Sequence, residues 1–465
     1  MTDPSMEPST GSGRRVTGVP LARLGATEVL AVLLPLLTVA ALALVRPLDA
    51  PPGLLAPKEV PLERSTIVCP GPLSSSGALG RIVSLASADG VSGELAVRVP
   101  ADDVLTMTGI ARTSPKTAYV VQAECDLAAG LVGSRYGAGA AVRCGSPQPE
   151  QWFTGVGAAP EHSSTLELVN PDGGPAVADV SILGPDGPLD VAALRGVTVP
   201  GGQTLRFDLS EVVPSREELA MQVVVSRGRL GVQVFDQAQE VGGARSRDWL
   251  PAQSQPDASA YLLGLGGKSG DRTLVVANPG DSEARVTVEV ITKESQFAPA
   301  DFDEIRVPPR STTTVDLTRL LGQPTTRGAT GLHLEATAPV TAGLRTVAAG
   351  DLTHAVSGAH LTTRATLALP SGPARLVLGG ADGVGVATYV VLDDEGKELA
   401  RERVELNPGV GLRIKLPASG AVLDLTMERS RVFAAVEVGP PGLAVLPLTE
   451  LVTEARVPDV RPALR

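Results

Sequence analysis

The chain reads TLELVNPDG at residues 165–173 and TLVVANPGD at residues 273–281. In both stretches an apolar run ends at an Asn-Pro pair, which is typical of a β-strand that stops in a turn. The second stretch repeats the first at an offset of 108 residues. We therefore predict β-structure built from a repeated unit of about one hundred residues.

The same offset relates residue pairs outside the two stretches. These pairs are Val180 and Val288, Val199-Pro200 and Val307-Pro308, and Asp208-Leu209 and Asp316-Leu317. From residue 64 onward the apolar residues follow a period of two, and turns such as PDG, PGG and NPG separate the runs. This pattern indicates an all-β chain. A fainter copy of the unit follows residue 366, and the most divergent copy would occupy residues 64–145.

The unit length favours one fold over another. About one hundred residues with about seven short strands fit an immunoglobulin-like β-sandwich, so we predict tandem sandwiches of this type. The alternative is a β-propeller in which each unit gives two four-stranded blades. Propeller blades repeat at about 40 to 50 residues, and the sequence has no such half-period. Sandwiches are therefore the favoured interpretation.

The composition shifts along the chain predict a series of segments. These are a cytoplasmic tail at 1–24, a transmembrane signal anchor at 25–45, a Pro-rich linker at 46–63, a divergent β-domain with three cysteines at 64–150, β-sandwich repeats at 151–250, 251–365 and 366–450, and a C-terminal tail at 451–465.

The anchor rests on an uncharged run of 17 residues, Val29–Val45. With the residues just before it, the run reaches the length that crosses a bilayer. Arg14, Arg15 and Arg23 precede the run, and only Arg46 follows closely, so the positive-inside rule places the N-terminus in the cytoplasm. We expect a single-pass protein of the plasma membrane whose bulk is extracytoplasmic. A cleaved signal peptide and a buried core helix are the two alternatives.

Three cysteines, Cys69, Cys125 and Cys144, fall in the first part of the predicted ectodomain. Outside the cytoplasm two of them can pair. Cys69 with Cys144 is the preferred disulfide, because it would tie the start of the first domain to its end. Sequence does not determine connectivity, so three buried free thiols remain the alternative.

The charge and the motifs exclude several functions. A net charge of −11 argues against nucleic acid as a partner, because nucleic-acid binding needs clustered basic residues. The glycine-rich segment GLGGKSG at 264–270 lacks the first glycine of a phosphate loop, since Leu262 stands there. Gly-x-Ser-x-Gly does not occur. His354 and His360, with Asp351 nearby, are too few for a zinc site. We predict no catalytic residue, no metal and no cofactor.

Two tryptophans, Trp152 and Trp249, are the only ones in the chain. Both lie where one predicted unit gives way to the next. Packing between domains is the simpler interpretation. Exposed platforms for a ligand, of the kind that sugar-binding sites use, are the alternative.

The sequence resembles a known family in several motifs together. These are the single anchor, VCPGP at 68–72, CGSPQPEQWF at 144–153, and the TLELVNPDG and TLVVANPGD repeats. The combination resembles the membrane-anchored secreted proteins of actinobacteria grouped as domain-of-unknown-function family 5719. The resemblance implies a location in the cell envelope. It implies no activity, because none is established for that family.

We therefore expect a non-catalytic, membrane-anchored protein that presents β-domains for binding or scaffolding in the cell envelope. Its partner would be another envelope protein or a cell-wall polymer. One alternative function is a glycan-binding module of the cell wall. The other is an envelope hydrolase with a site that no sequence motif reveals.

Overall fold

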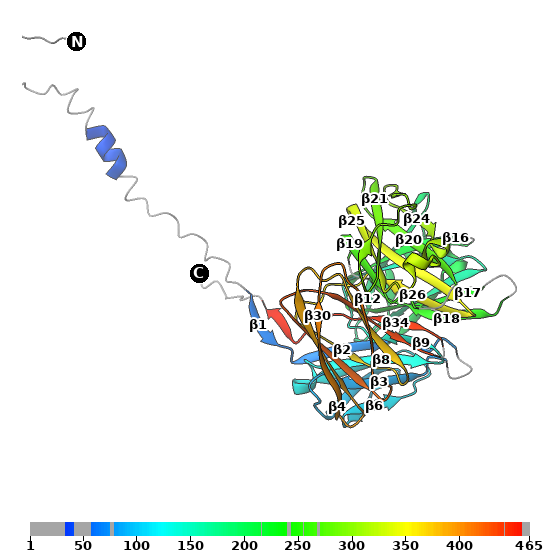
Figure 1. Cartoon of the computed structure of the whole chain (residues 1–465). Helices are drawn as coiled ribbons and strands as arrows, with labels where there is room; N and C mark the ends of the chain where they lie inside the picture. The colour runs from blue at the N-terminus through cyan, green and yellow to red at the C-terminus, as the bar shows by residue number, and fades with distance from the viewer. Residues whose placement is uncertain are drawn as a thin grey trace, which may run out of the picture. The chain divides into compact units, whose positions relative to one another are not determined.

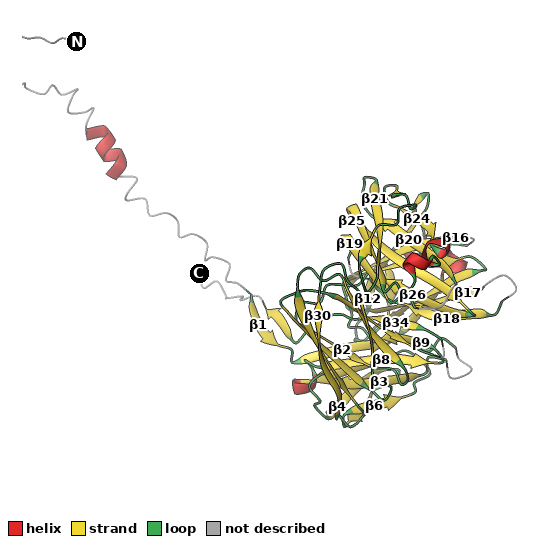
Figure 2. Ribbon diagram, viewed as in Figure 1, coloured by secondary structure: helices red, strands yellow, loops and turns green. Residues whose placement is uncertain are grey.

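The computed structural model describes residues 33–40, 57–74, 79–214, 216–239, 243–253, 255–266, 270–440 and 442–457. The described part of the chain is mostly β-strand, which confirms the all-β prediction (Figure 2). Contacts divide the chain into two compact bodies, Met1–Lys58 with Arg456–Arg465, and Glu59–Ala455. The second body holds nearly all the strands.

The predicted anchor falls mainly on residues that the structure does not describe. Residues 33–40 are helical, whereas 25–32 and 41–45, like the predicted tail at 1–24, lie outside the described residues. Within the described ranges, no helix combines the length and the apolar character that crossing a membrane requires.

Four groups of strands follow one another along the second body, and we refer to them as units. The first unit has eight strands: β2 (Arg64–Cys69), β3 (Ile82–Ser87), β4 (Gly93–Val99), β5 (Asp103–Met107), β6 (Ile110–Thr113), β7 (Tyr119–Glu124), β8 (Leu131–Gly137) and β9 (Ala140–Arg143). The fourth unit has the same number: β27 (Arg364–Ala368), β28 (Ala374–Gly379), β29 (Gly385–Leu392), β30 (Glu398–Leu406), β31 (Leu412–Lys415), β32 (Val422–Glu428), β33 (Phe433–Val438) and β34 (Ala444–Pro447).

The second and third units contain the repeat. The second has β10 (Glu150–Ala158), β11 (His162–Val169), β12 (Ala176–Gly184), β13 (Gly187–Leu189), β14 (Val197–Val199), β15 (Thr204–Asp208), β16 (Arg216–Arg227), β17 (Gly231–Gln239) and β18 (Arg245–Leu250). The third has β19 (Asp257–Leu263), β20 (Asp271–Asn278), β21 (Ala284–Ile291), β22 (Gln296–Phe297), β23 (Ile305–Val307), β24 (Ser311–Asp316), β25 (Gly331–Ala348) and β26 (Asp351–Val356).

Short elements complete the described chain. These are α2 (Leu209–Val212) and α3 (Thr318–Leu321), the 3-10 turns η1 (Cys125–Leu127), η2 (Ala192–Leu194) and η3 (Pro324–Thr326), and the two-stranded sheet of β1 (Lys58–Pro61) and β35 (Glu454–Val457).

All four units share one strand order. In the first unit one sheet runs β2-β7-β4-β5 and the other β6-β3-β8-β9, and in the fourth the orders are β27-β32-β29-β30 and β31-β28-β33-β34. In the second unit the orders β10-β16-β12-β13 and β15-β11-β17-β18 are the two halves of one nine-stranded sheet, which a short pairing of β10 with β11 joins. The third unit follows the same order. The first part of the 18-residue strand β25 pairs with β19 and β21, and its second part pairs with β20 and β26, so β25 takes the place of two strands.

The two sheets of each unit enclose a single apolar core. In the first unit, for example, Ile67 and Val121 of one sheet cluster with Leu85 of the other. Comparable clusters fill the second, third and fourth units. Among the described strands no sheet closes into a barrel, and neighbouring strands are mostly not consecutive along the chain. This pairing does not fit the propeller alternative, because the strands of a propeller blade follow one another along the chain.

The repeated Asn-Pro pairs have a structural role. The buried Nδ2 of Asn170 donates to Gly174 O and Val199 O, and its Oδ1 accepts from Asp172 N. Asn278 makes the equivalent bonds to Ser282 O, Val307 O and Gly280 N. Each amide thus fastens the turn after one strand to the end of another. A buried amide with these bonds satisfies several backbone groups at once.

The four units form a closed cycle of contacts. Their last strands contact one another in the order β9, β18, β26, β34 and back to β9 (Figure 1). The closing contact between the fourth and first units includes Arg364 Nη1 on Asp89 Oδ1 at 2.8 Å. It also includes Ser134 Oγ, which donates to Ala368 O at 2.6 Å. The units are therefore packed into one block and do not form an extended string.

Candidate functional site

A groove of about 460 Å³ lies on the outer face of the second unit, on the sheet that contains β12 and β16. Across this sheet Ser181 lies opposite Gln222, and Gln222 lies opposite Trp152. The residues that alternate with them along the strands, such as Val180 and Phe153, belong to the core. Because successive side chains of a strand point to opposite faces, this row faces outward into the groove.

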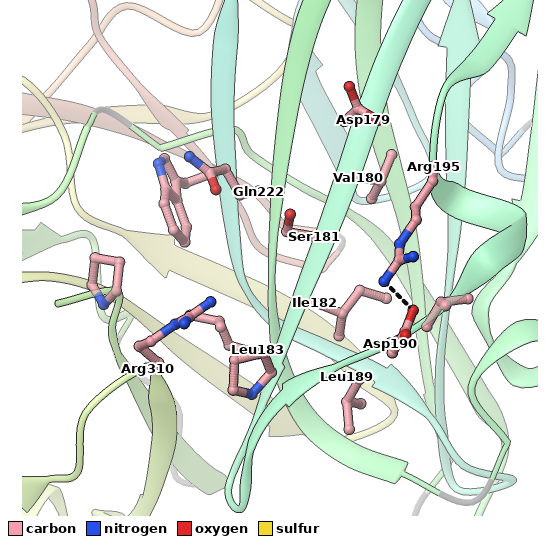
Figure 3. Close-up of a pocket in the computed structure, with 14 residues that line it drawn as sticks. Asp179, Val180, Ser181, Ile182, Leu183, Leu189, Asp190, Arg195, Gln222 and Arg310 are labelled. Atoms are coloured by element: carbon pink, nitrogen blue, oxygen red, sulfur yellow. Dashed lines mark ion pairs between the residues drawn. The ribbon is translucent and has the colours of Figure 1, made fainter. Parts of the chain in front are cut away.

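Charged side chains line the rims of the groove. On one rim Arg195 forms an ion pair with Asp190, and Ser181 and Gln222 lie between this pair and Arg310 (Figure 3). Arg310 belongs to the third unit, so two units build the site. Asp179 lines the groove as well, and its Oδ1 accepts a hydrogen bond from Gly196 N at 2.8 Å.

Arg310 has an unusual backbone. Its φ is 51°, in the left-handed region that side chains other than glycine rarely adopt. The equivalent residue of the second unit, at the 108-residue offset, is Gly202, whose φ is 67°. The third unit thus places an arginine where the second unit has the glycine that this turn favours. The backbone strain reduces the stability of the fold by an amount on the order of 1 kcal/mol. Among the described residues the Arg310 side chain has no ion-pair partner.

Trp152 borders the groove but is not an open platform. Its side chain is 3% exposed and packs against Leu183, Ala220 and Ala277, the last from the third unit. Its Nε1 donates to Glu150 Oε1 at 2.9 Å, and Gln222 Nε2 donates to the same oxygen at 2.7 Å. The indole therefore joins two units and holds the groove wall.

Trp249 lies at a different junction and is 1% exposed. It packs against Ala140 and Val142 of the first unit, and its ring centroid lies 6.5 Å from that of Phe235. Neither indole has an exposed face on which a sugar could stack. The platform interpretation lacks the exposed aromatic surface that it requires.

The cysteines tie the first unit together. Cys69 of β2 and Cys144, just after β9, form a disulfide across a sequence separation of 75 residues. Closing a loop of this length stabilises the fold by about 4 kcal/mol in the chain-entropy account. Cys125 is a free, exposed thiol.

A buried charged cluster joins the second and third units. Asp236 of β17 accepts from Ser164 Oγ at 2.5 Å, and its carboxylate lies 3.1 Å from Nε2 of both His162 and His354. His354 comes from the third unit, on β26. A second ion pair crosses the same junction, from Arg345 Nη2 to Glu218 Oε1 at 2.6 Å.

The pKa values of this cluster follow from its pairing. Burial lowers the pKa of His162, but the attraction and hydrogen bonding of Asp236 outweigh burial and raise it to about 9. Burial alone would raise the pKa of Asp236, yet His162 and His354 hold it well below its usual range. His162 is therefore charged near neutral pH, and the cluster is a structural joint in which every ionised group has a partner.

The histidines considered for zinc are separated in the structure. His354 faces Asp236, whereas the ring of His360 packs at a tilt against Phe433 with centroids 4.1 Å apart. In the described ranges no three His, Cys, Asp or Glu side chains are grouped so that they could hold a metal ion. Residues 267–269, in the glycine-rich segment, lie outside the described residues.

Sequence reasoning did not identify Gln222 or Arg310. Gln222 carries no motif, and only the register of β16 brings it between Ser181 and Trp152. A signal for Arg310 did exist, because aligning the two copies of the repeat places an arginine against Gly202.

Comparison with known proteins identifies a family and little more. A search of curated proteins finds none that matches this chain. The family described as "Family of unknown function (DUF5719)" matches residues 95–417, which is more than half of the sequence. On this match, the chain belongs to the DUF5719 family.

Proposed function

We propose that this chain is a single-pass membrane protein of the cell envelope whose four units are tandem immunoglobulin-like sandwiches that present a binding surface to another envelope component. The groove beside Trp152 is the binding site in this proposal. Its occupant carries an anionic group that pairs with Arg310.

The proposed location rests on the sequence and on the cysteines. The uncharged run Val29–Val45 and the arginines before it favour a signal anchor with a cytoplasmic N-terminus. A disulfide between Cys69 and Cys144 suits an oxidising compartment outside the cytoplasm.

The closed cycle of units suits a binding role. A groove assembled from two units keeps its shape only if the junction between them is rigid. The joint of Asp236 with His162 and His354, and the packing of Trp152 on Ala277, both fix that junction. Binding loses less conformational entropy when the site is already ordered.

Arg310 is the observation that carries the proposal. A left-handed arginine at a glycine position destabilises the turn, and strain of this kind persists where it has a use. Its guanidinium lines the groove without an ion-pair partner among the described residues, so a carboxylate or phosphate of a ligand would complete it. Ser181, Gln222 and Asp179 add hydrogen-bonding groups along the floor.

Photocrosslinking in the native membrane tests the groove. A photoreactive residue at position 181 is expected to capture one partner, and the same residue at Thr388 is the control. Thr388 faces outward on β29, the strand of the fourth unit that corresponds to β12. The Arg310→Gly variant is expected to lose the adduct while its stability stays the same or rises by about 1 kcal/mol.

The form of the adduct separates the two classes of partner. Peptides of a second protein in the digested adduct, found by mass spectrometry, identify a protein partner. An adduct whose added mass glycan hydrolases remove supports the cell-wall glycan alternative. Equal capture at positions 181 and 388, or full capture by the Arg310→Gly variant, would contradict the groove as the site.

Cys125 offers a test of the location. Its thiol is exposed, so a membrane-impermeant maleimide is expected to label intact cells, and the Cys125→Ser variant is the control. Labelling that occurs only after the cells are lysed would overturn the proposed orientation.

A further inference from the structure

Three side chains of the third unit form a connected row on the outer face of the sheet that contains β19, β25 and β21. Ser259 Oγ lies 3.0 Å from His333 Nε2, and His333 Nδ1 lies 2.8 Å from Glu289 Oε2. The residues come from different strands, and their separations along the chain are 74 and 44 positions. A hydroxyl, an imidazole and a carboxylate connected in this order have the geometry of an activated nucleophile.

The carboxylate determines which nitrogen of His333 is free. Burial raises the pKa of Glu289, but hydrogen bonds from His333 and Gln296 outweigh burial and lower it, so Glu289 is ionised. An ionised carboxylate accepts only, so His333 Nδ1 donates to it. Gln296 Nε2 lies 2.9 Å from Nδ1 as well, but it donates to Glu289 Oε2 at 2.6 Å. Nε2 of His333 is then left to accept from the Ser259 hydroxyl. This is the tautomer that a general base needs.

Packing holds the imidazole in place. The Tyr261 ring stacks on His333 with centroids 4.2 Å apart. Tyr261 also stacks on the Phe433 ring, with centroids 4.5 Å apart. His333 is only 7% exposed, whereas Ser259 is half-buried. The base is therefore fixed and shielded while the hydroxyl is within reach of solvent.

The sister unit shows that the fold does not require this row. In the third unit Glu289 lies opposite His333, and His333 lies opposite Tyr261. The corresponding row of the second unit is Ser181, Gln222 and Trp152, in that order. Glu289 is at the 108-residue offset from Ser181. The second unit builds the same sheet without an ionisable group at these two positions. The Glu-His pair is thus an addition to the fold.

Ser259 lies on the edge strand of its sheet, and its N–H is directed at an anionic oxygen. The N–H donates to Oδ1 of exposed Asp257 at 3.1 Å. The N–H of the nucleophile is a common donor to the oxyanion of an acyl-transfer intermediate. The Asp257 carboxylate occupies the place of that oxyanion and would have to move aside for a substrate.

We propose that Ser259 is a nucleophile for carboxylic esters, with His333 as its general base and Glu289 as the residue that positions His333. In the first step the hydroxyl proton passes to His333 Nε2 and Oγ bonds to the ester carbonyl carbon. The alcohol then leaves with the proton from Nε2. Water, activated by His333, attacks the acyl-enzyme, so the carboxylic acid is released and the proton returns to Oγ.

A fluorophosphonate probe tests the nucleophile directly on the full-length protein in membranes. We expect one covalent adduct, which mass spectrometry of the digested protein maps to Ser259. Ser259→Ala is expected to abolish it, and His333→Gln to slow it at least 100-fold. Ser226→Ala is the matched control, because Ser226 is an exposed strand serine whose hydroxyl donates to a backbone carbonyl, Val177 O.

Two further variants separate catalysis from structure. Asp257→Ala is expected to speed labelling several-fold, because it uncovers the Ser259 N–H. Glu289→Gln is expected to slow labelling more than Glu289→Asp does, since only a carboxylate accepts from Nδ1 as a charged group. The unfolding midpoint of each variant shows that it is folded. An absent adduct, an adduct on another serine, or an unchanged rate in His333→Gln overturns the proposal.

Discussion

The second and third units use the same three positions of the same sheet in different ways. In the second, Ser181, Gln222 and Trp152 form the floor and wall of a groove. In the third, the equivalent positions hold Glu289, His333 and Tyr261. Glu289 and His333 form a chain of hydrogen bonds that ends at Ser259, and Tyr261 stacks on His333. The same strand pairing aligns these three positions in both units. The chemistry therefore depends on outward-facing side chains, which can differ between the units without a change of fold.

What the two units keep in common is equally informative. The turn amides Asn170 and Asn278 make matching bonds and are fully buried in both. The junction between the units, by contrast, depends on Asp236 and His354, and neither residue recurs at the 108-residue offset. Substitutions at the junction, in the shared turns and in the outward rows should therefore have effects of decreasing size on stability.

The largest effect is expected at the junction, from Asp236→Ala. The change removes the nearer carboxylate from the buried, charged His162, which keeps only Glu218 Oε1 at 3.5 Å from Nδ1. Breaking a buried ion pair in this way costs about 4 kcal/mol. Denaturant unfolding measures the loss. Asp186→Ala is the control, because its pair with Arg216 spans 3.7 Å on an exposed surface and should contribute less than about 1 kcal/mol. Equal losses in the two variants would refute the role of the joint.

The shared turns are expected to come next. Asn278→Ala leaves Val307 O and Ser282 O without a donor, and we expect a loss of about 3 kcal/mol. Asn170→Ala should give a similar loss, because its bonds match. Asn407 also precedes a proline but is exposed, so Asn407→Ala should change the free energy of unfolding little. A large difference between the first two variants would show that the two turns are not equivalent.

A pH titration of stability should distinguish the junction from the rest. The pKa of His162 is raised from 6.5 to about 9 in the folded chain, so its contribution is complete below pH 6.5 and is lost as the pH rises through 9. The thermal unfolding midpoint should therefore fall between these values. In His162→Gln this part of the pH dependence should disappear. An unchanged pH profile in that variant would mean that the cluster does not titrate as the geometry implies.

The sequence was sufficient for the strand content and for the equivalence of the second and third units, because both follow from local patterns. It indicated the first and fourth units only as faint copies at 64–145 and after residue 366, since few residue identities recur there at a fixed spacing. It did not reveal the closed cycle, which depends on packing among β9, β18, β26 and β34. Periodicity reports which face of a strand is buried, and it carries little information about which strands of different units meet.

The site residues were hidden for a related reason. Ser259, His333 and Glu289 have no short motif, because three strands deliver them and the pairing register alone aligns them. One residue of slippage in β25 would send His333 to the core face. Arg310 is the exception, since its contrast with Gly202 is visible once the repeat is aligned.

The smallest effect on stability is expected from giving the third unit the row of the second, with Glu289→Ser and His333→Gln together. Because Ser181 and Gln222 occupy these positions in a sheet of the same order, the double variant should lose only about 1 kcal/mol, from the stacking on Tyr261 and a partly exposed hydrogen bond. Denaturant unfolding measures this loss, and labelling of Ser259 should be abolished in the same preparation. A loss of 3 kcal/mol or more would mean that the third unit needs the Glu-His pair for its stability. The pair could then no longer be interpreted as a catalytic feature that the fold does not require.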